Sequence, residues 1–135
     1  MNYKNFEDWA AQVPDSITND PLWNFDTYRK GLFLSDLAWH DSDKLLADTR
    51  GKGIAWQLID SAGSVAANIE EGYGRGYGKD YARFLRISLG SARETRGWYY
   101  RSRHLLDPNV VTHRLKLIDE IIAGLVKTSE QQRRL

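Results

Sequence analysis

The segment from Gly72 to Gly78 alternates glycine with Tyr73, Arg75 and Tyr77, and these side chains could bind a ligand. Tyrosine rings can stack on unpaired bases and arginine supplies positive charge, so the composition suits a single-stranded nucleic acid. The glycines also suit a plain turn between two helices, because glycine often ends a helix. The sequence leaves both interpretations open.

The glycine segment does not have the spacing of a nucleotide-phosphate loop. Such a loop follows a strand and places Ser or Thr directly after its lysine. Here Lys79 is followed by Asp80, and the preceding residues have the periodicity of a helix. We therefore expect no nucleotide cofactor.

Positive charge continues from the glycine segment into the residues that follow it. Residues 72–106 contain eight Lys or Arg against two Asp or Glu, whereas residues 1–71 contain six against twelve. Such a division suggests an anionic partner, or attraction between two parts of the chain. The alternative is a solvated face, or pairing with Asp36, Asp41 and Asp43. The candidate anion-binding cations are Arg75, Lys79, Arg83, Arg86, Arg93 and Arg96.

No catalytic constellation is found in the chain. The absence of cysteine excludes disulfides, thiol chemistry and cysteine zinc sites. Asp36, His40 and Asp43 share one helical face, but a single helix supplies too few ligands for a metal site. Serines at inward-facing positions have no His and acid at a recognisable spacing, so close helix packing explains them better than nucleophilic catalysis. We expect a protein with no catalytic residues, no bound metal and no cofactor.

Apolar residues recur at steps of three and four through most of the chain, which is the period of amphipathic helices. Helices joined by short connections favour an antiparallel up-down four-helix bundle, so the expected fold class is all-α. We assign residues 21–135 to this bundle domain and residues 1–20 to a short helical extension packed on its outside. The expected helices cover about Pro21 to Ala47, Gly53 to Glu71, Lys79 to Leu106 and Asn109 to Gln132.

Several details of these helices can be predicted. The first begins with Asp20 as N-cap and Pro21 at its first position, and its spacing points Trp39 toward the core. Gly72 is the expected end of the second helix. The third helix has the most regular spacing, with a second apolar row beside its main row. The main row is Phe84, Ser88, Ser91, Thr95, Trp98, Ser102 and Leu105, and the second is Leu85, Ala92, Tyr99 and Leu106.

The end of the second helix and the start of the third must form a corner around the glycine segment. Asn68 lies beside the apolar stripe of its helix, so it should be partly buried and hydrogen-bonded. Glu71 could reach Arg75 across the turn. We interpret Asn68, Glu71, Gly72 and Gly74 as a structural corner, with a binding role as the alternative.

Two motifs in this region carry a family resemblance. Residues 68–75 read Asn-Ile-Glu-Glu-Gly-Tyr-Gly-Arg, and residues 84–91 read Phe-Leu-Arg-Ile-Ser-Leu-Gly-Ser. With the acid–aromatic pair Asp80–Tyr81 between them, they resemble the bacterial four-helix-bundle proteins encoded by intervening sequences in large-subunit ribosomal RNA genes. The resemblance covers about residues 25–125. This chain departs from the family at Glu70, where Ala is usual, and in its glycine-rich Gly76–Gly78 segment.

The resemblance implies an up-down bundle that assembles into five-subunit rings, in a family whose molecular function is unsettled. A related bundle is the accessory protein of diversity-generating retroelements, a basic ring that works beside a reverse transcriptase and binds nucleic acid. In such a ring, a head-to-tail interface could set the acidic first helix of one subunit against the arginine face of the next.

Together, these features favour a non-enzymatic, ring-forming protein that binds RNA or DNA through the six cations named above, with Tyr73 and Tyr77 as stacking groups. The alternative is an assembly or adaptor protein whose arginine face meets a protein partner, for example a reverse transcriptase. No apolar run approaches a membrane span, and the first residues lack the layout of a signal peptide. We therefore expect a cytoplasmic protein with no membrane partner, and the family resemblance implies that it is a homo-oligomer, a pentameric ring.

Overall fold

The computed structural model describes residues 1–135, which form helices and no strand. The expectation of an all-α protein is therefore confirmed. The α-helices and the 3-10 helices (η) are α1 (Phe6–Ala10), α2 (Asp15–Thr18), η1 (Pro21–Asn24), α3 (Asp26–Leu46), α4 (Gly51–Tyr73), α5 (Lys79–Arg101), η2 (Ser102–His104) and α6 (Pro108–Arg133).

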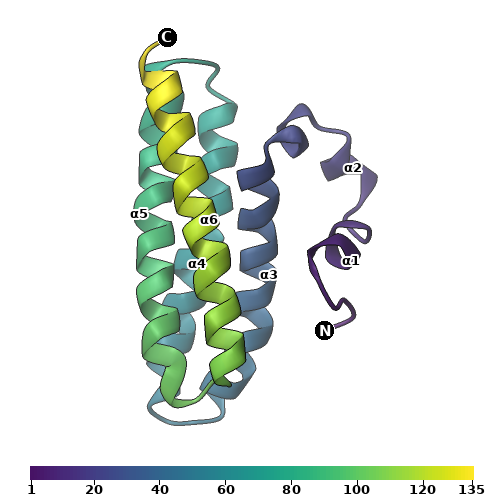
Figure 1. Ribbon diagram of the computed structural model, residues 1–135, viewed down its shortest axis with the longest axis vertical. Helices are drawn as coiled ribbons and strands as arrows, with labels where there is room; N and C mark the ends of the chain where they lie inside the picture. Colours follow the sequence, from purple (N-terminus) through teal and green to yellow (C-terminus); the bar gives the residue numbers. More distant parts are fainter.

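The long helices α3, α4, α5 and α6 form the body of the molecule and lie side by side (Figure 1). Neighbours in the sequence pack against each other, and α6 also contacts α3. Each helix contributes side chains to one shared core, because its apolar residues recur on one face. Fully buried examples from the four helices are Leu34, Leu58, Leu85, Ile118 and Leu125.

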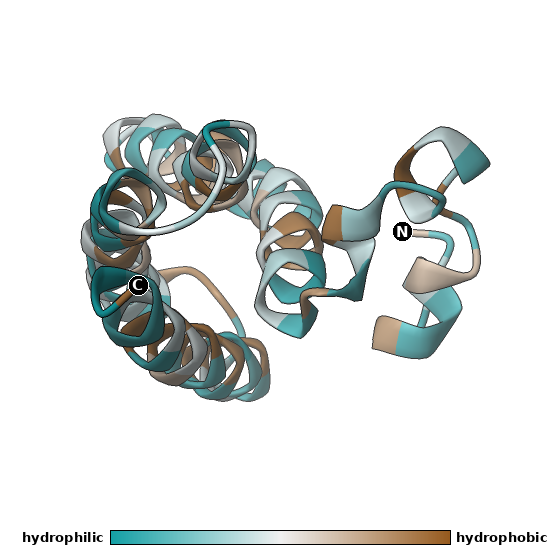
Figure 2. Ribbon diagram, turned by 90° about the horizontal axis from the view of Figure 1, so that it is seen from above, coloured by the Kyte–Doolittle hydropathy of each residue, from teal (hydrophilic) through white to brown (hydrophobic).

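The N-terminal residues lie outside the bundle, on the side of α3 (Figures 1 and 2). Trp9 is buried there, and its indole N–H donates a hydrogen bond of 2.7 Å to Asp36. The ring of Phe33 on α3 lies 5.2 Å from the Trp9 ring and 5.4 Å from the Phe6 ring, centroid to centroid. Helices as short as α1 are not stable alone, so this aromatic contact with α3 is what orders the segment.

The helix that we expected from Pro21 to Ala47 is interrupted near its start. The first residues form η1, Phe25 is extended with φ −83° and ψ 105°, and the α-helix begins only at Asp26. Asp20 does cap η1, since its carboxylate accepts the Leu22 N–H at 2.9 Å.

The prediction that Trp39 faces the core is wrong. Trp39 is 63% exposed, while its neighbours Leu37 and Ala38 are buried. The inward stripe of α3 continues through Ser42 and Leu45, and a residue one position beyond Ala38 is turned about 100° from that stripe. The buried row of α3 therefore passes through Ala38, and Trp39 lies beside it on the solvent side.

The buried face of α5 is centred on the row that we placed second. Leu85, Ala92 and Tyr99 are completely buried, whereas the expected main row alternates between buried and half-buried positions. The half-buried members are Phe84, Ser91, Trp98 and Leu105. The α-helix also ends at Arg101 and continues only as η2, short of the predicted end at Leu106.

Buried hydroxyl groups join α4 to α5. Ser88 donates to the Val65 carbonyl at 2.8 Å, and Thr95 lies 2.9 Å from the Ser61 hydroxyl. Thr95 also bonds the Ser91 carbonyl at 2.8 Å. Such small side chains allow the two helix backbones to approach closely while the buried hydroxyls between them keep hydrogen-bond partners.

Candidate nucleic-acid interface

The glycine segment forms the connection between α4 and α5. Gly76 and Gly78 have φ values of 95° and 90°, a region that residues with a side chain rarely adopt. The Gly78 N–H donates to the side-chain oxygen of Gln132 at 2.9 Å. This hydrogen bond fixes the start of α5 to the last turn of α6, so the end of the glycine segment is held against α6.

Gly72 does not end α4, contrary to the prediction. The helix continues to Tyr73, and Gly74, with right-handed backbone angles, is its C-cap. A Cβ atom at Gly72 would lie 2.6 Å from the Phe84 Cβ and 3.0 Å from the Tyr81 ring. Glycine is needed at this position because α5 approaches the α4 backbone too closely for any side chain.

The corner residues act differently from one another. Glu71 reaches Arg75 at 3.0 Å, and Arg75 also lies 3.7 Å from Asp80 at the start of α5. Asn68 does not brace this corner, because its amide donates to the carbonyl and hydroxyl of Ser64, one turn earlier in α4. The side chains that join the end of α4 to the start of α5 are therefore the charged Glu71, Arg75 and Asp80, and Asn68 does not take part.

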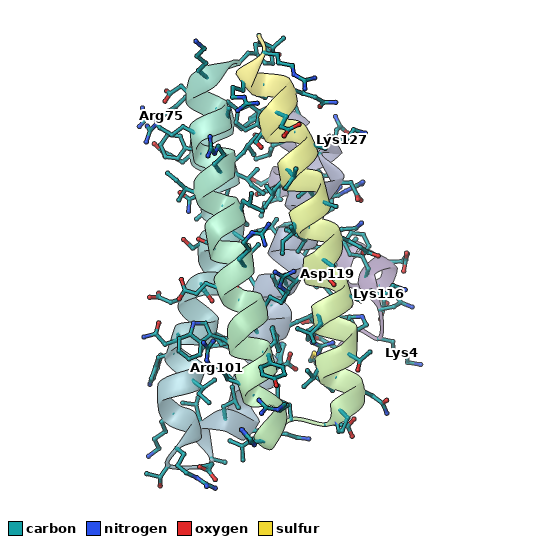
Figure 3. All side chains as sticks on the ribbon, turned by 60° about the vertical axis from the view of Figure 1, so that its left-hand side comes forward. Lys4, Arg75, Arg101, Lys116, Asp119 and Lys127 are labelled. Atoms are coloured by element: carbon teal, nitrogen blue, oxygen red, sulfur yellow. The ribbon has the colours of Figure 1, made fainter.

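Arg75 and Arg83 share both their carboxylate and their aromatic contact. Asp80 lies 3.3 Å from Arg83, and the guanidinium carbons of Arg75 and Arg83 lie 4.9 Å and 4.5 Å from the Phe84 ring centre. Figure 3 shows Arg75 on the side of α5 away from α6. Both arginines are thus partly neutralised, although each remains about half-exposed.

The remaining candidate cations fall into two groups. Arg96 pairs at 3.0 Å with Asp119 of α6, the residue labelled in Figure 3. Lys79, Arg86 and Arg93 are exposed and have no carboxylate within 4.0 Å. These three are the candidate cations whose charge is not paired with a carboxylate and is available to a ligand.

The two tyrosines of the glycine segment also differ. Tyr73 is 37% exposed, and its ring packs edge-on against Tyr81 with the centroids 6.0 Å apart. Tyr77 is 82% exposed and has no aromatic neighbour. Tyr77 is therefore the tyrosine whose ring is open for stacking.

A buried ionic network was missed by the sequence analysis. Arg114 of α6 donates two hydrogen bonds to Asp41 of α3, at 2.7 Å and 3.0 Å, and both side chains are less than 10% exposed. The Tyr99 hydroxyl of α5 donates to the same carboxylate at 2.7 Å. The network joins three helices, so Asp41 pairs inside the bundle rather than with the arginine face.

The buried network shifts the pKa values of two of its members, Tyr99 and Arg114. Burial raises the pKa of Tyr99 well above its ordinary value, and the charge of Asp41 adds to this effect, so the hydroxyl stays protonated and donates. Burial alone would lower the pKa of Arg114, but its hydrogen bonds and charge pairing with Asp41 outweigh burial and raise it. Both groups therefore keep the protonation states that the hydrogen bonds require.

His113 extends this network to the surface. Arg114 lies 2.8 Å from His113 Nδ1, and because a guanidinium has no acceptor, Nδ1 must accept and the imidazole must be neutral. Partial burial, together with the adjacent Arg114 charge, lowers the pKa of His113 below its ordinary value.

Replacing His113 by glutamine is expected to reduce the loss of unfolding free energy that occurs when the pH falls. A lowered folded-state pKa gives stability that is fully present above the unfolded value of about 6.5, and lost as the pH falls through the folded value. Urea unfolding at about pH 7.5 and about pH 5 should therefore show a smaller loss for His113→Gln than for the wild type. Carboxylates contribute equally to both proteins, and an equal loss in the two would contradict this role of His113.

No cluster of three or more metal-ligating side chains is present, and no helix combines the length and hydrophobicity needed to cross a bilayer.

Comparison with known proteins places this geometry in a family. Residues 24–127 match the family described as 23S rRNA-intervening sequence protein. A crystal structure of a protein with unknown function from the S23 ribosomal protein family of Bacteroides thetaiotaomicron VPI-5482 has a similar fold, with a TM-score of 0.68 and 21% identity. The similarity covers 75% of this chain and 95% of that protein. No curated protein matches the chain. The chain therefore belongs to the 23S rRNA-intervening sequence protein family.

Proposed function

We propose that this protein is a non-enzymatic, ring-forming up-down bundle that binds RNA or DNA through the basic face of α5. The observation that carries the proposal is that three cations of α5 are exposed and not paired with a carboxylate. Lys79, Arg86 and Arg93 are exposed without carboxylate partners, on a helix whose only acidic residues are Asp80 and Glu94. Exposed cations without carboxylate partners are suited to binding phosphate groups.

Three other carboxylates have partners other than the free cations Lys79, Arg86 and Arg93. Asp41 is occupied by Arg114, Asp36 accepts the Trp9 indole, and Glu94 accepts the Trp98 indole at 3.0 Å. Arg75, Arg83 and Arg96 have weak, exposed ion pairs, which cost little to exchange for a phosphate. They would join the binding surface as secondary contacts, with Tyr77 as a stacking group.

Assembly into a ring is supported by two exposed tryptophans on α3 and α4. Trp39 of α3 and Trp56 of α4 are each 63% exposed, which is unusual for residues of this size. A head-to-tail contact that covers these tryptophans in each subunit gives a ring when the rotation between successive subunits closes. The short connections between the four long helices favour the up-down order that such a subunit requires.

The second candidate is an assembly or adaptor protein whose arginine face binds a protein partner, such as a reverse transcriptase. Glu71 and Asp80 beside Arg75 and Arg83 give that end of α5 mixed charge, which suits a protein surface as well as a phosphate backbone. Salt dependence distinguishes the candidates, because counterion release makes nucleic-acid affinity fall steeply with salt.

The test is fluorescence anisotropy with labelled RNA and DNA oligonucleotides over a range of salt concentrations. We expect a log–log salt slope of several units for the wild type. Arg83→Glu with Arg86→Glu should abolish binding and leave the circular dichroism spectrum unchanged, because both side chains are exposed. Unfolding of this variant, or no binding by the wild type at low salt, would contradict the proposal.

A further inference from the structure

A basic groove lies between the first half of α5 and the last turn of α6. It is a hollow of about 600 Å³ lined by six residues. Lys79, Arg83 and Arg86 come from α5 and Arg133 comes from α6, with no carboxylate among the lining residues. Arg133 was not among the candidate cations in the sequence, because it is far from α5 along the chain.

The cations converge because the two helices are fixed to each other at this end. Gln132, the residue before Arg133, holds the Gly78 N–H at 2.9 Å, directly before Lys79. Lys79 and Arg86 are two helical turns apart, which separates them by about 10 Å along α5. The positive charge therefore extends far enough for more than one phosphate group.

Two nearby carboxylates, Asp80 and Glu130, do not line this groove. Asp80 lies 3.3 Å from Arg83 and 3.7 Å from Arg75, and it does not line the hollow. Glu130 lines the neighbouring hollow together with Arg86 and Arg133, and its carboxylate lies 4.0 Å from Arg134. Lys79, Arg86 and Arg133 have no carboxylate within 4.0 Å, so they would gain most from an anionic ligand.

The rest of the groove is apolar. It is completed by Ala82 and by Ile87, a large aliphatic residue that is 43% exposed. A duplex presents phosphates to such a groove but keeps the faces of its bases covered by stacking. An unpaired strand can place a base or ribose on the apolar surface while its phosphates meet the surrounding cations.

We infer that this groove is the binding site for an unpaired nucleic-acid strand, and that Arg133 of α6 is one of its phosphate-binding residues. The inference rests on the proposed function and makes it more specific. It narrows the site from the whole basic face of α5 to the α5–α6 groove, and it selects single strands over duplexes.

The experiment measures the affinity of the full chain for a 20-nucleotide single strand and for the same sequence as a duplex. Four phosphate contacts predict a single-strand salt slope of about −3. Arg133→Ala should weaken single-strand binding about tenfold and reduce the size of the slope by about one unit. Ile87→Ser should weaken single-strand binding about fivefold and leave duplex binding unchanged.

The matched control is Arg50→Ala. Arg50 is 89% exposed, pairs with Asp48 and precedes α4, about 30 Å of helix away from the glycine segment. We expect its affinity to equal that of the wild type. If Arg133→Ala also binds like the wild type, or if the duplex binds as tightly as the single strand, the groove is not the site, although nucleic-acid binding would stand. If the wild type binds neither probe, the proposed function itself fails.

Discussion

Arg114→Leu is expected to lower the free energy of unfolding by about 3–5 kcal/mol, because it removes one partner of a buried ion pair. The substitution leaves Asp41 as a buried carboxylate with only the Tyr99 hydroxyl as a partner. An uncompensated buried charge costs far more than the ion pair contributes, because neither water nor a countercharge replaces the lost guanidinium. Urea unfolding followed by circular dichroism measures the change.

Two controls separate the buried network from ordinary ion pairing. Asp119→Ala removes the partner of Arg96, whose 3.0 Å contact equals the longer of the two Arg114–Asp41 contacts but lies in solvent, and should cost less than about 1 kcal/mol. Asp41→Leu combined with Arg114→Leu should be more stable than either single variant, because no unpaired charge remains. A loss below about 1 kcal/mol in Arg114→Leu would mean that the pair is open to water.

Gly72→Ala is expected to destabilise the protein by about 1–3 kcal/mol, although alanine is the better helix former. The added methyl group would lie 2.6 Å from the Phe84 Cβ, an atom fixed to the α5 backbone that cannot rotate away. The start of α5 must move, and with it the cations of the α5–α6 groove. We therefore expect weaker oligonucleotide binding together with a lower thermal midpoint.

The matched variant is Gly90→Ala, in the middle of α5. Nothing lies within 4 Å of a Cβ atom at this position, so the helix gains about 1 kcal/mol of propensity without a clash. The two alanine substitutions should therefore shift the thermal midpoint in opposite directions. A stabilised Gly72→Ala variant would show that α4 and α5 are not in close contact at this corner.

The four long helices could be predicted because each has an apolar stripe at helical spacing, and the structure differs from them mainly at their ends. The break at Phe25 has no such signal, since apolar residues continue through it. Trp39 was misplaced because a large aromatic residue at a permitted spacing counts as inward, whereas the helix buries the adjacent Ala38.

The site was partly predictable for a different reason. The α5 cations are neighbours in the sequence, so their common helix could be inferred, but which of them are free of carboxylates depends on tertiary contacts. Arg133 joins them only through the packing of α6 against α5. Arg114 did have a signal, because it lies three residues after Val111 and four before Ile118, on the inward row of its helix.

The most direct test of a ring that binds nucleic acid is light scattering coupled to size exclusion, with and without a mixed pool of RNA and DNA oligonucleotides. We expect one species of several subunits that carries oligonucleotide at low salt and releases it at high salt. A monomer at micromolar concentration would contradict ring assembly. An assembled species that excludes oligonucleotide at low salt would contradict nucleic-acid binding and favour the protein-adaptor alternative.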